Sequence, residues 1–289
     1  MDKFDELLKK IGNTPLVETK IERVYAKLES KNPAGSIKDR AAFFMLRRAK
    51  DKIGKGIVEA TSGNTGIGHA YVGSQIGVKT VIVMPDNMSL ERRQMIASYG
   101  AQLVLTPAAE GMEGAVKKAR ELESEGFYFI NQFANEGNIE AHFETTAPEV
   151  FKAIPDAICI VAGIGSGGTV MGFKKYIKAN GLKCKVVGVE PKSSPLLTKG
   201  YAGPHKIQGI GANFVPSILD KSEVDLILPI SDEDAFDYVK WFYKTSGEKV
   251  GISSGATLAA AELISERTNG KIVAILADGG DRYSDELYE

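Results

Sequence analysis

The sequence contains few residues of the types that build metal and redox sites: its 289 residues include only 3 His and 2 Cys. The histidines, His69, His142 and His205, show no metal-ligand spacing with cysteine or carboxylate residues, so no metal site is expected. Cys159 and Cys184 lack CxxC spacing and fall in apolar, strand-like segments. We expect two reduced core thiols, with a reactive thiol as the alternative.

The sequence also has a small net charge and lacks long apolar runs. The formal net charge of -1 gives no global electrostatic reason to bind nucleic acid or an anionic membrane. No uncharged apolar stretch approaches the length that crosses a bilayer. Residues 1–8 form an acidic amphipathic pattern without the basic region and apolar run of a secretory signal. We therefore expect a cytoplasmic protein that acts on small molecules, with no nucleic-acid or membrane partner.

Short β-rich runs alternate with helical periods along the chain, which predicts an α/β protein with parallel sheets and helices on their faces. The expected strands are residues 24–28, 57–60, 80–84, 102–105, 157–162, 185–190, 226–229 and 272–276. The expected helices are residues 1–8, a helix that starts near 38 and runs to 49, and residues 64–76, 89–99, 113–124, 140–151, 169–180, 232–244 and 256–266.

Two such series in tandem favour two open-sheet domains with the active site in the cleft between them. We expect a smaller, mobile N-terminal domain over residues 35–140. A larger domain would combine residues 1–34 with 141–289. Ligands of such sheets collect at the carboxyl ends of the strands, and the glycine-rich segments of this sequence fall there.

One lysine stands in an unusual position. A loop rich in turn formers, residues 32–37, leads into the apolar-periodic residues 41–49, which predicts that Lys38 stands at a helix start. The positive end of the helix dipole disfavours an ammonium group there, so we expect a lowered pKa for Lys38. A nucleophilic amine needs such a pKa. The competing interpretation is a solvated surface lysine.

A first glycine-rich segment, TSGNTG at residues 61–66, directly follows an apolar strand. Its glycines let the backbone approach a ligand, and its hydroxyl and amide side chains lie beside the open N–H groups of the next helix. That arrangement suits an anion such as a carboxylate. An ordinary capped helix start is the alternative.

A second segment, GIGSGGT at residues 163–169, matches GxGxxG between a strand and a helix, and Glu190 ends the next strand. A dinucleotide-binding fold is therefore a serious rival interpretation. Ser166 and Thr169 add polar donors to the glycines, however, and form a compact cup that suits one phosphate better than a pyrophosphate.

A third segment, GISSG at residues 251–255, satisfies the GxSxG pattern of serine hydrolases. In that fold the catalytic histidine follows the serine in the chain. The last histidine here is His205, so the pattern disfavours a hydrolase.

Together these segments resemble the fold-type II pyridoxal phosphate enzymes, in particular the cysteine synthase (O-acetylserine sulfhydrylase) family with its cystathionine β-synthase relatives. The resemblance covers nearly the whole chain. It rests, in this order, on residues 11–16, 31–40, 61–68, 88–93, 132–133, 165–169, 188–191, 206–211 and 251–255.

The resemblance implies a role for each segment. Lys38 would carry pyridoxal 5'-phosphate as a Schiff base and later take the α proton of the substrate. Asn64 would bind the ring hydroxyl of the cofactor, and Ser253 would face its ring nitrogen. The phosphate would lie on Gly165, Ser166, Gly167, Gly168 and Thr169. The substrate carboxylate would be held by Thr61, Ser62, Gly63, Asn64, Thr65 and Gln132.

The implied reaction is a β-replacement that makes L-cysteine from O-acetyl-L-serine and sulfide through an aminoacrylate intermediate, with release of acetate. O-Phosphoserine sulfhydrylase and cystathionine β-synthase activities are alternatives, and a serine or threonine dehydratase is a weaker one. A nicotinamide oxidoreductase and a non-catalytic binding protein also stay open from the motifs alone. The resemblance further implies a homodimer and leaves a serine acetyltransferase partner open.

Overall fold

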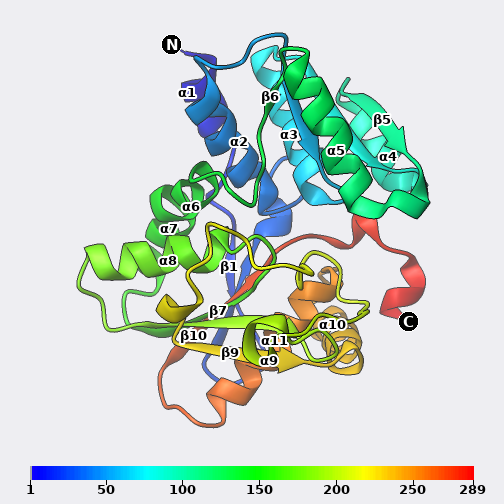
Figure 1. Cartoon of the computed structure of the whole chain (residues 1–289). Helices are drawn as coiled ribbons and strands as arrows, with labels where there is room; N and C mark the ends of the chain where they lie inside the picture. Colours follow the sequence, from blue (N-terminus) through cyan, green and yellow to red (C-terminus); the bar gives the residue numbers. More distant parts are fainter. Residues whose placement is uncertain (1) are drawn as a thin grey trace. The chain divides into compact units, whose positions relative to one another are not determined.

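The computed structural model describes residues 2–289 (Figure 1). Met1, the first residue of the expected N-terminal helix, lies outside the described residues. The chain divides into two units: residues 2–11 with Lys38–Asn138, and Gly12–Ile37 with Ile139–Glu289. Each unit contains one open sheet with helices packed on it, which confirms the expected α/β class. The domain limits drawn from the sequence, 35–140 and 1–34 plus 141–289, stay a prediction.

The first unit is built on a four-stranded parallel sheet in the order β5-β4-β3-β6. The strands are β3 (Ile57–Ala60), β4 (Thr80–Pro85), β5 (Gln102–Thr106) and β6 (Tyr128–Phe129). The helices are α1 (Lys3–Leu8), α2 (Lys38–Ala49), α3 (Asn64–Ile76), α4 (Leu90–Ser98) and α5 (Gly111–Ser124).

The two faces of this sheet are covered by different helices. Val58 and Ala60 of β3 pack with Ala115 and Ala119 of α5 in one apolar cluster. Because side chains alternate along a strand, Ile57 and Glu59 point to the opposite face. Helix α3 covers that face, since a Cβ atom at Gly66 would lie 3.1 Å from Cγ2 of Ile82, the residue of β4 that pairs with Glu59.

The second unit is built on a six-stranded sheet in the order β1-β2-β10-β7-β8-β9. Only the β1–β2 pair of this sheet is antiparallel. The strands are β1 (Leu16–Glu18), β2 (Val24–Leu28), β7 (Ala157–Gly163), β8 (Lys185–Pro191), β9 (Leu226–Ile230) and β10 (Lys271–Leu276). The helices are α7 (Ala147–Ala153), α8 (Gly168–Ala179), α9 (Leu196–Lys199), α10 (Asp232–Ser246) and α11 (Ile252–Ser265), and a π-helical segment, His142–Thr146, follows α6 (Gly137–Ala141).

Two apolar cores lie on opposite faces of this six-stranded sheet. One joins the sheet to α10 and α11 and includes Val161 and Phe242. The other joins it to α7 and α8 and includes Ile160 and Phe173. Ile160 and Val161 are neighbours in β7 and serve opposite cores, as the alternation of a strand buried on both faces requires.

Most elements lie within a residue or two of their expected limits. The sequence prediction missed β1, which is an edge strand of three residues, and β6, which has two residues. It also began α11 at residue 256, whereas the helix starts at Ile252. Glycine and serine residues are typical of loops, but here Gly255 lets α11 pack tightly on α10: a Cβ atom at this position would lie 2.0 Å from the Ala235 carbonyl oxygen.

No helix within residues 2–289 has the length and apolar character needed to span a bilayer.

Candidate active site

Lys38 is the first residue of α2, as the sequence predicts, and its side chain is half-buried. Helix α3 packs directly on this end of α2. A Cβ atom at Gly68 would lie 2.9 Å from the Lys38 carbonyl oxygen, so glycine permits the close approach. Asn64 begins α3 and lies one helical turn before Gly68, which puts it on the same face of the helix. The structure thus brings Lys38 and Asn64 to one place in the first unit.

The segment Thr61–Thr65 joins the carboxyl end of β3 to α3. Gly63 is the N-cap of α3 and provides no side-chain cap, so the first N–H groups of the helix face the loop without one. Thr61 Oγ1 accepts a hydrogen bond from the Gly63 N–H at 3.3 Å. An uncapped helix N-terminus beside hydroxyl groups suits an anion, and the binding of a substrate carboxylate there stays a prediction.

Gln132 lies against this segment, 67 residues later in the chain than Thr65. Thr65 Oγ1 donates a hydrogen bond to Gln132 Oε1 at 2.7 Å, and both side chains are buried. The Gln132 carbonyl oxygen accepts a hydrogen bond from Asn138 Nδ2 at 2.9 Å. The structure therefore groups Gln132 with the Thr61–Thr65 segment, as expected.

Arg92 of α4 supports the same segment from outside. Its Nη1 donates a hydrogen bond to the Ser62 carbonyl oxygen at 3.0 Å. The resemblance includes residues 88–93, but no role for Arg92 was predicted, because a contact between residues 30 positions apart leaves no local pattern in the sequence.

Glu59 was not singled out from the sequence, although it is the most perturbed carboxyl group near this segment. It is 1% exposed, and its Oε1 accepts a hydrogen bond from the Gln132 backbone N–H at 3.4 Å. Burial raises the pKa of Glu59 to about 8, and the backbone N–H groups of Gln132 and Asn131 oppose that shift. The carboxyl group is thus neutral through most of the physiological pH range.

In the second unit, the loop after β7 has the shape of an anion cup. Gly167, the N-cap of α8, has a φ of +87°, and a Cβ atom there would lie 2.9 Å from the Leu219 side chain. A Cβ atom at Gly165 would lie 2.4 Å from the Gly209 carbonyl oxygen. Both positions therefore require glycine. The turn leads into α8, whose N-terminus has no side-chain cap, and Ser166 is buried within it.

The side chain of Thr169, the last residue of this cup, contacts His142. Its Oγ1 lies 3.4 Å from Nε2 of His142, and Nδ1 of His142 lies 2.9 Å from Thr146 Oγ1. His142 and Thr146 are the two ends of the π-helical segment, and such segments often mark functional sites. The sequence indicated only that His142 lacks metal-ligand spacing, and its contact with Thr169 was not predicted.

Ser253 lies close to this cup-shaped loop. It lies in the first turn of α11 and is 5% exposed, and its Oγ is 3.9 Å from the Cβ position of Gly209, the residue that crowds Gly165. The structure thus joins Ser253 and the cup in one place through Gly209. Ser253 thus provides an uncharged hydroxyl group beside the cup.

Glu190 does not have the role that a nicotinamide enzyme needs. It is 1% exposed, and its carboxylate accepts hydrogen bonds from the backbone N–H groups of Leu197 at 2.8 Å and Thr198 at 3.2 Å. The Thr198 hydroxyl donates a further bond to it. A carboxylate occupied in this way holds the α9 turn, so the dinucleotide interpretation loses its ribose-binding group.

The cysteines behave as core residues. Both are free and buried, and burial raises the pKa of each thiol to about 12. Such thiols stay protonated and unreactive. Cys184 lies one residue before β8, not within a strand as expected. Within residues 2–289, no group of three or more His, Cys, Asp or Glu side chains is placed to hold a metal ion.

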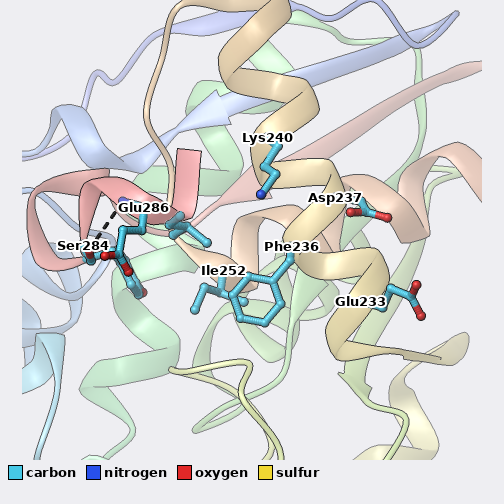
Figure 2. Close-up of a pocket in the computed structure, with 9 residues that line it drawn as sticks. Glu233, Phe236, Asp237, Lys240, Ile252, Ser284 and Glu286 are labelled. Carbon is cyan, nitrogen blue, oxygen red and sulfur yellow. Dashed lines mark hydrogen bonds between the residues drawn. The ribbon is translucent and has the colours of Figure 1, made fainter. Parts of the chain in front are cut away.

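A separate pocket of about 480 Å³ opens between α10 and the C-terminal segment of the second unit (Figure 2). Phe236, Ile252 and Leu287 form its apolar part, and Glu233 and Asp237 stand on its rim. Its lining includes none of the site residues predicted from the sequence, although Ile252 directly precedes Ser253.

A family model described as pyridoxal-phosphate dependent enzyme matches residues 7–278. The chain belongs to this family. It is 48% identical to cysteine synthase B of Campylobacter jejuni over 98% of its own length and 96% of the relative. This membership confirms the resemblance read from the sequence and the dependence on pyridoxal phosphate.

Solved structures agree with this assignment. A cysteine synthase from Entamoeba histolytica superimposes with a TM-score of 0.92 and 38% identity, covering 98% of this chain and 90% of that one. An O-acetylserine dependent cystathionine β-synthase from Helicobacter pylori has a TM-score of 0.88 and 37% identity, covering 96% of each chain. The expected fold type of this family member is thereby confirmed.

The residues present fit pyridoxal phosphate. The cup at residues 165–169 excludes Cβ atoms at two positions and offers backbone N–H groups and hydroxyls, which is the donor set of a phosphate site. Ser253 provides a hydroxyl beside that cup, and Lys38 provides an amine at a helix start in the first unit.

Proposed function

We propose that this protein is a cysteine synthase that converts O-acetyl-L-serine and sulfide into L-cysteine and acetate. The observation that carries the proposal is the 48% identity to a cysteine synthase over 98% of the chain. Three of the predicted segments support it, because Thr61–Thr65, Gln132 and Gly165–Thr169 come after the carboxyl ends of parallel strands β3, β6 and β7, where α/β proteins bind their ligands.

Each site residue has a definite part in this proposal. Lys38 would hold the cofactor covalently through Nζ, and the same nitrogen, once released, would take the α proton of the amino acid. The residue set for the phosphate is Gly165, Ser166, Gly167, Gly168 and Thr169. Ser253 would accompany the ring nitrogen and Asn64 the ring hydroxyl. The bound cofactor supplies an electron sink for the α carbon of the substrate.

The carboxylate of the amino acid would bind to the Thr61–Thr65 segment and Gln132. Helix N–H groups, hydroxyls and an amide make this site, and none of them carries a net charge. A carboxylate bound by backbone and amide donors is held by directed hydrogen bonds, which fix the orientation of the α carbon. Ser253 is likewise neutral, so it would leave the ring nitrogen largely unprotonated and favour prompt loss of the β substituent.

Cystathionine β-synthase activity is the second candidate, because one structural neighbour is an O-acetylserine dependent enzyme of that kind. The two candidates share the donor and differ in the sulfur nucleophile. O-Phosphoserine as donor and dehydration of serine or threonine have no comparable support here.

The test is a donor and acceptor panel on the purified, cofactor-loaded protein. O-Acetyl-L-serine with sulfide should give L-cysteine at the highest kcat/KM, measured by chromatography of the derivatised product. Homocysteine in place of sulfide should give less cystathionine. Keto acid formation from L-serine that exceeds cysteine formation would refute the proposal in favour of a dehydratase. A higher kcat/KM with O-phospho-L-serine than with O-acetyl-L-serine would show that O-phospho-L-serine is the preferred donor.

We also propose that the protein is a cytoplasmic homodimer. The family resemblance supports the assembly, and two free, buried thiols are typical of a reducing compartment. Light scattering should give twice the mass of 31.1 kDa, and cell fractionation should recover the protein with cytoplasmic markers. A serine acetyltransferase partner would appear as a heavier complex when the two are mixed.

A further inference from the structure

Gln132 is held on three sides by described residues. Its backbone N–H donates to Glu59 Oε1, its carbonyl oxygen accepts from Asn138 Nδ2, and its side-chain Oε1 accepts from Thr65 Oγ1. Because Oε1 is engaged by Thr65, Nε2 is the end of the amide that can donate a hydrogen bond to a ligand. The preceding residue, Asn131, adopts a φ of +52°, an uncommon conformation that the surrounding contacts must hold.

We propose that Glu59 is a positioning residue for Gln132: from its buried place on β3 it holds the backbone N–H of this residue, so that Nε2 meets the carboxylate of the amino-acid substrate. The proposal rests on the proposed function for the identity of that substrate. It adds a residue that the motifs of the sequence did not contain.

Glu59 is suited to this part by its place in the sheet. It lies on β3 one residue before Ala60, so it is anchored in the strand that leads into the Thr61–Thr65 segment. From there it reaches across to the backbone after β6, which pairs with β3. One side chain thus ties the two parts of the carboxylate site to each other. A shorter or apolar residue would leave the Gln132 N–H without this acceptor.

The charge state of the Glu59 carboxyl group matters because few other charged side chains lie near it. Four elements pack on β3: β4 has no ionisable side chain, β6 has Tyr128, α3 has His69 and Tyr71, and α5 lies on the opposite face. The charged side chains of α5 are exposed or half-buried. Burial lowers the pKa of His69 to about 3, so His69 stays neutral, and burial also raises the pKa of Tyr71.

Ionisation of Glu59 would place a negative charge directly behind Gln132. A carboxylate substrate would then meet a like charge across a buried, low-dielectric region, which weakens its binding. With the pKa of Glu59 raised to about 8, this change falls between pH 7 and pH 9. Substrate affinity should therefore fall through that range for a reason that belongs to the protein and not to the substrate.

The decisive comparison uses wild type and Glu59→Gln as cofactor-loaded enzymes. Glutamine keeps the acceptor oxygen and cannot ionise. We expect similar KM values for O-acetyl-L-serine at pH 7, and at pH 9 a KM of wild type about tenfold above that of the variant, with similar kcat. Titration of the substrate amine affects both proteins equally and cancels in the ratio. A KM ratio that stays constant from pH 7 to pH 9 would overturn the proposal.

Glu29→Gln is the matched control, because Glu29 is also fully buried but accepts its hydrogen bonds from Thr14 and Asn32 in the second unit. This control should give the same pH dependence of KM as wild type. If Glu29→Gln removes the dependence as well, the effect is not specific to Glu59 and the proposal fails.

Hydrogen–deuterium exchange of residues 130–138 tests the positioning without substrate. Glu59→Ala should exchange about tenfold faster in this segment, and Glu59→Gln should match wild type. If Glu59→Ala does not fold, Glu59→Asp replaces it, since loss of one methylene withdraws the acceptor. Unchanged exchange would refute the role of Glu59. A wild type that does not turn over O-acetyl-L-serine would refute the proposed function instead and leave the exchange result to decide.

Discussion

The two proposed anion sites of this protein use different kinds of hydrogen-bonding groups. The carboxylate site of the first unit depends on side chains, with Thr65 and Gln132 joined over 67 residues and Glu59 behind them. The phosphate site of the second unit depends on backbone, with a turn from which Cβ atoms are excluded at Gly165 and Gly167.

This difference between backbone and side-chain donors matches how long each site would keep its ligand. A cofactor phosphate stays bound through many turnovers, so a rigid turn made of N–H groups is sufficient for it. A substrate carboxylate arrives and leaves in each cycle, and side-chain donors can distinguish it from other ligands. The two sites should therefore fail in different ways when they are mutated.

The largest effect is expected at Lys38, because we propose that this residue supplies both the covalent link and the base. Lys38→Ala should lower kcat by about 1,000-fold or more, since removal of a nucleophile and base abolishes the step they serve. The phosphate site should still bind the cofactor without covalent attachment. Absorption spectra before and after dialysis, together with steady-state rates, would test this. Borohydride labelling at any other lysine in wild type would contradict the assignment.

The phosphate site should be the more fragile one. Gly165→Ala places a methyl group against the Gly209 carbonyl oxygen, 2.4 Å away, so the turn must shift. We expect the dissociation constant of pyridoxal phosphate to rise about 100-fold, in line with a displaced set of directed N–H donors. Fluorescence titration of the cofactor-free protein would measure it. Unchanged cofactor affinity would show that the turn is not the phosphate site.

His69 offers a stability test confined to the first unit. It is fully buried, neither ring nitrogen has a partner among the described residues, and its pKa is lowered from 6.5 to about 3. Below pH 6.5 the unfolded chain binds a proton that the folded protein rejects, so stability falls as pH decreases toward 3.

At pH 5 this loss is about 2 kcal/mol, or 1.36 kcal/mol for each pH unit below 6.5. His69→Leu should therefore gain about 2 kcal/mol relative to wild type between pH 7.5 and pH 5, measured by urea unfolding at both values. Comparison with wild type also removes the contribution of Glu59, whose raised pKa lowers stability as pH rises from 4.5 to 8. An unfolding difference that does not depend on pH would contradict the neutral histidine.

The carboxylate site should lose affinity and keep its cofactor. Thr65→Val removes the donor to Gln132 Oε1 and keeps the shape of the side chain. We expect KM for O-acetyl-L-serine to rise about tenfold, since an unpaired buried amide oxygen costs 1–3 kcal/mol, with pyridoxal phosphate affinity unchanged. Ser246→Ala, at the end of α10, is a surface control that should match wild type in KM. If Thr65→Val weakened substrate and cofactor binding equally, the proposal that the two sites bind different ligands would be contradicted.

The smallest effect is expected at Gly63. Unlike Gly167, it has a negative φ of -131°, and a Cβ atom there would meet only Arg92 Nη1, at 3.7 Å. Gly63→Ser should add a side-chain cap to α3 and stabilise the ligand-free protein by a few tenths of a kcal/mol. The new hydroxyl should also compete with the substrate carboxylate and raise KM two- to threefold. Thermal unfolding and steady-state kinetics would show both changes.

The sequence predicted the parts of the site that depend on local pattern. Residues 61–66 and 163–169 are recognisable because a glycine-rich turn follows a strand and precedes a helix, and Lys38 because turn formers precede an apolar-periodic stretch. Their positions at helix starts are all found in the structure.

The supporting contacts could not be predicted in this way. Arg92 with Ser62, His142 with Thr169 and Glu59 with Gln132 join residues 27 to 73 positions apart. Glu59 is also a glutamate in a strand, a residue type that is usually exposed, so only the packed sheet shows that it is buried.

The helix ends give the protein a further property. The N-caps of helices α1, α4 and α10 are Asp2, Ser89 and Ser231, whose side chains accept a hydrogen bond from a backbone N–H of the first turn. Helices α3, α8 and α11, which contain several of the proposed site residues, have the glycine N-caps Gly63, Gly167 and Gly251 and no side-chain cap. Bound ligands would accept hydrogen bonds from the first N–H groups of these three helices, as cap side chains do elsewhere. Occupancy would then add to folding free energy, by about 2.7 kcal/mol at 100 times a ligand's Kd, so a cell that runs short of cofactor or donor would hold a less durable enzyme.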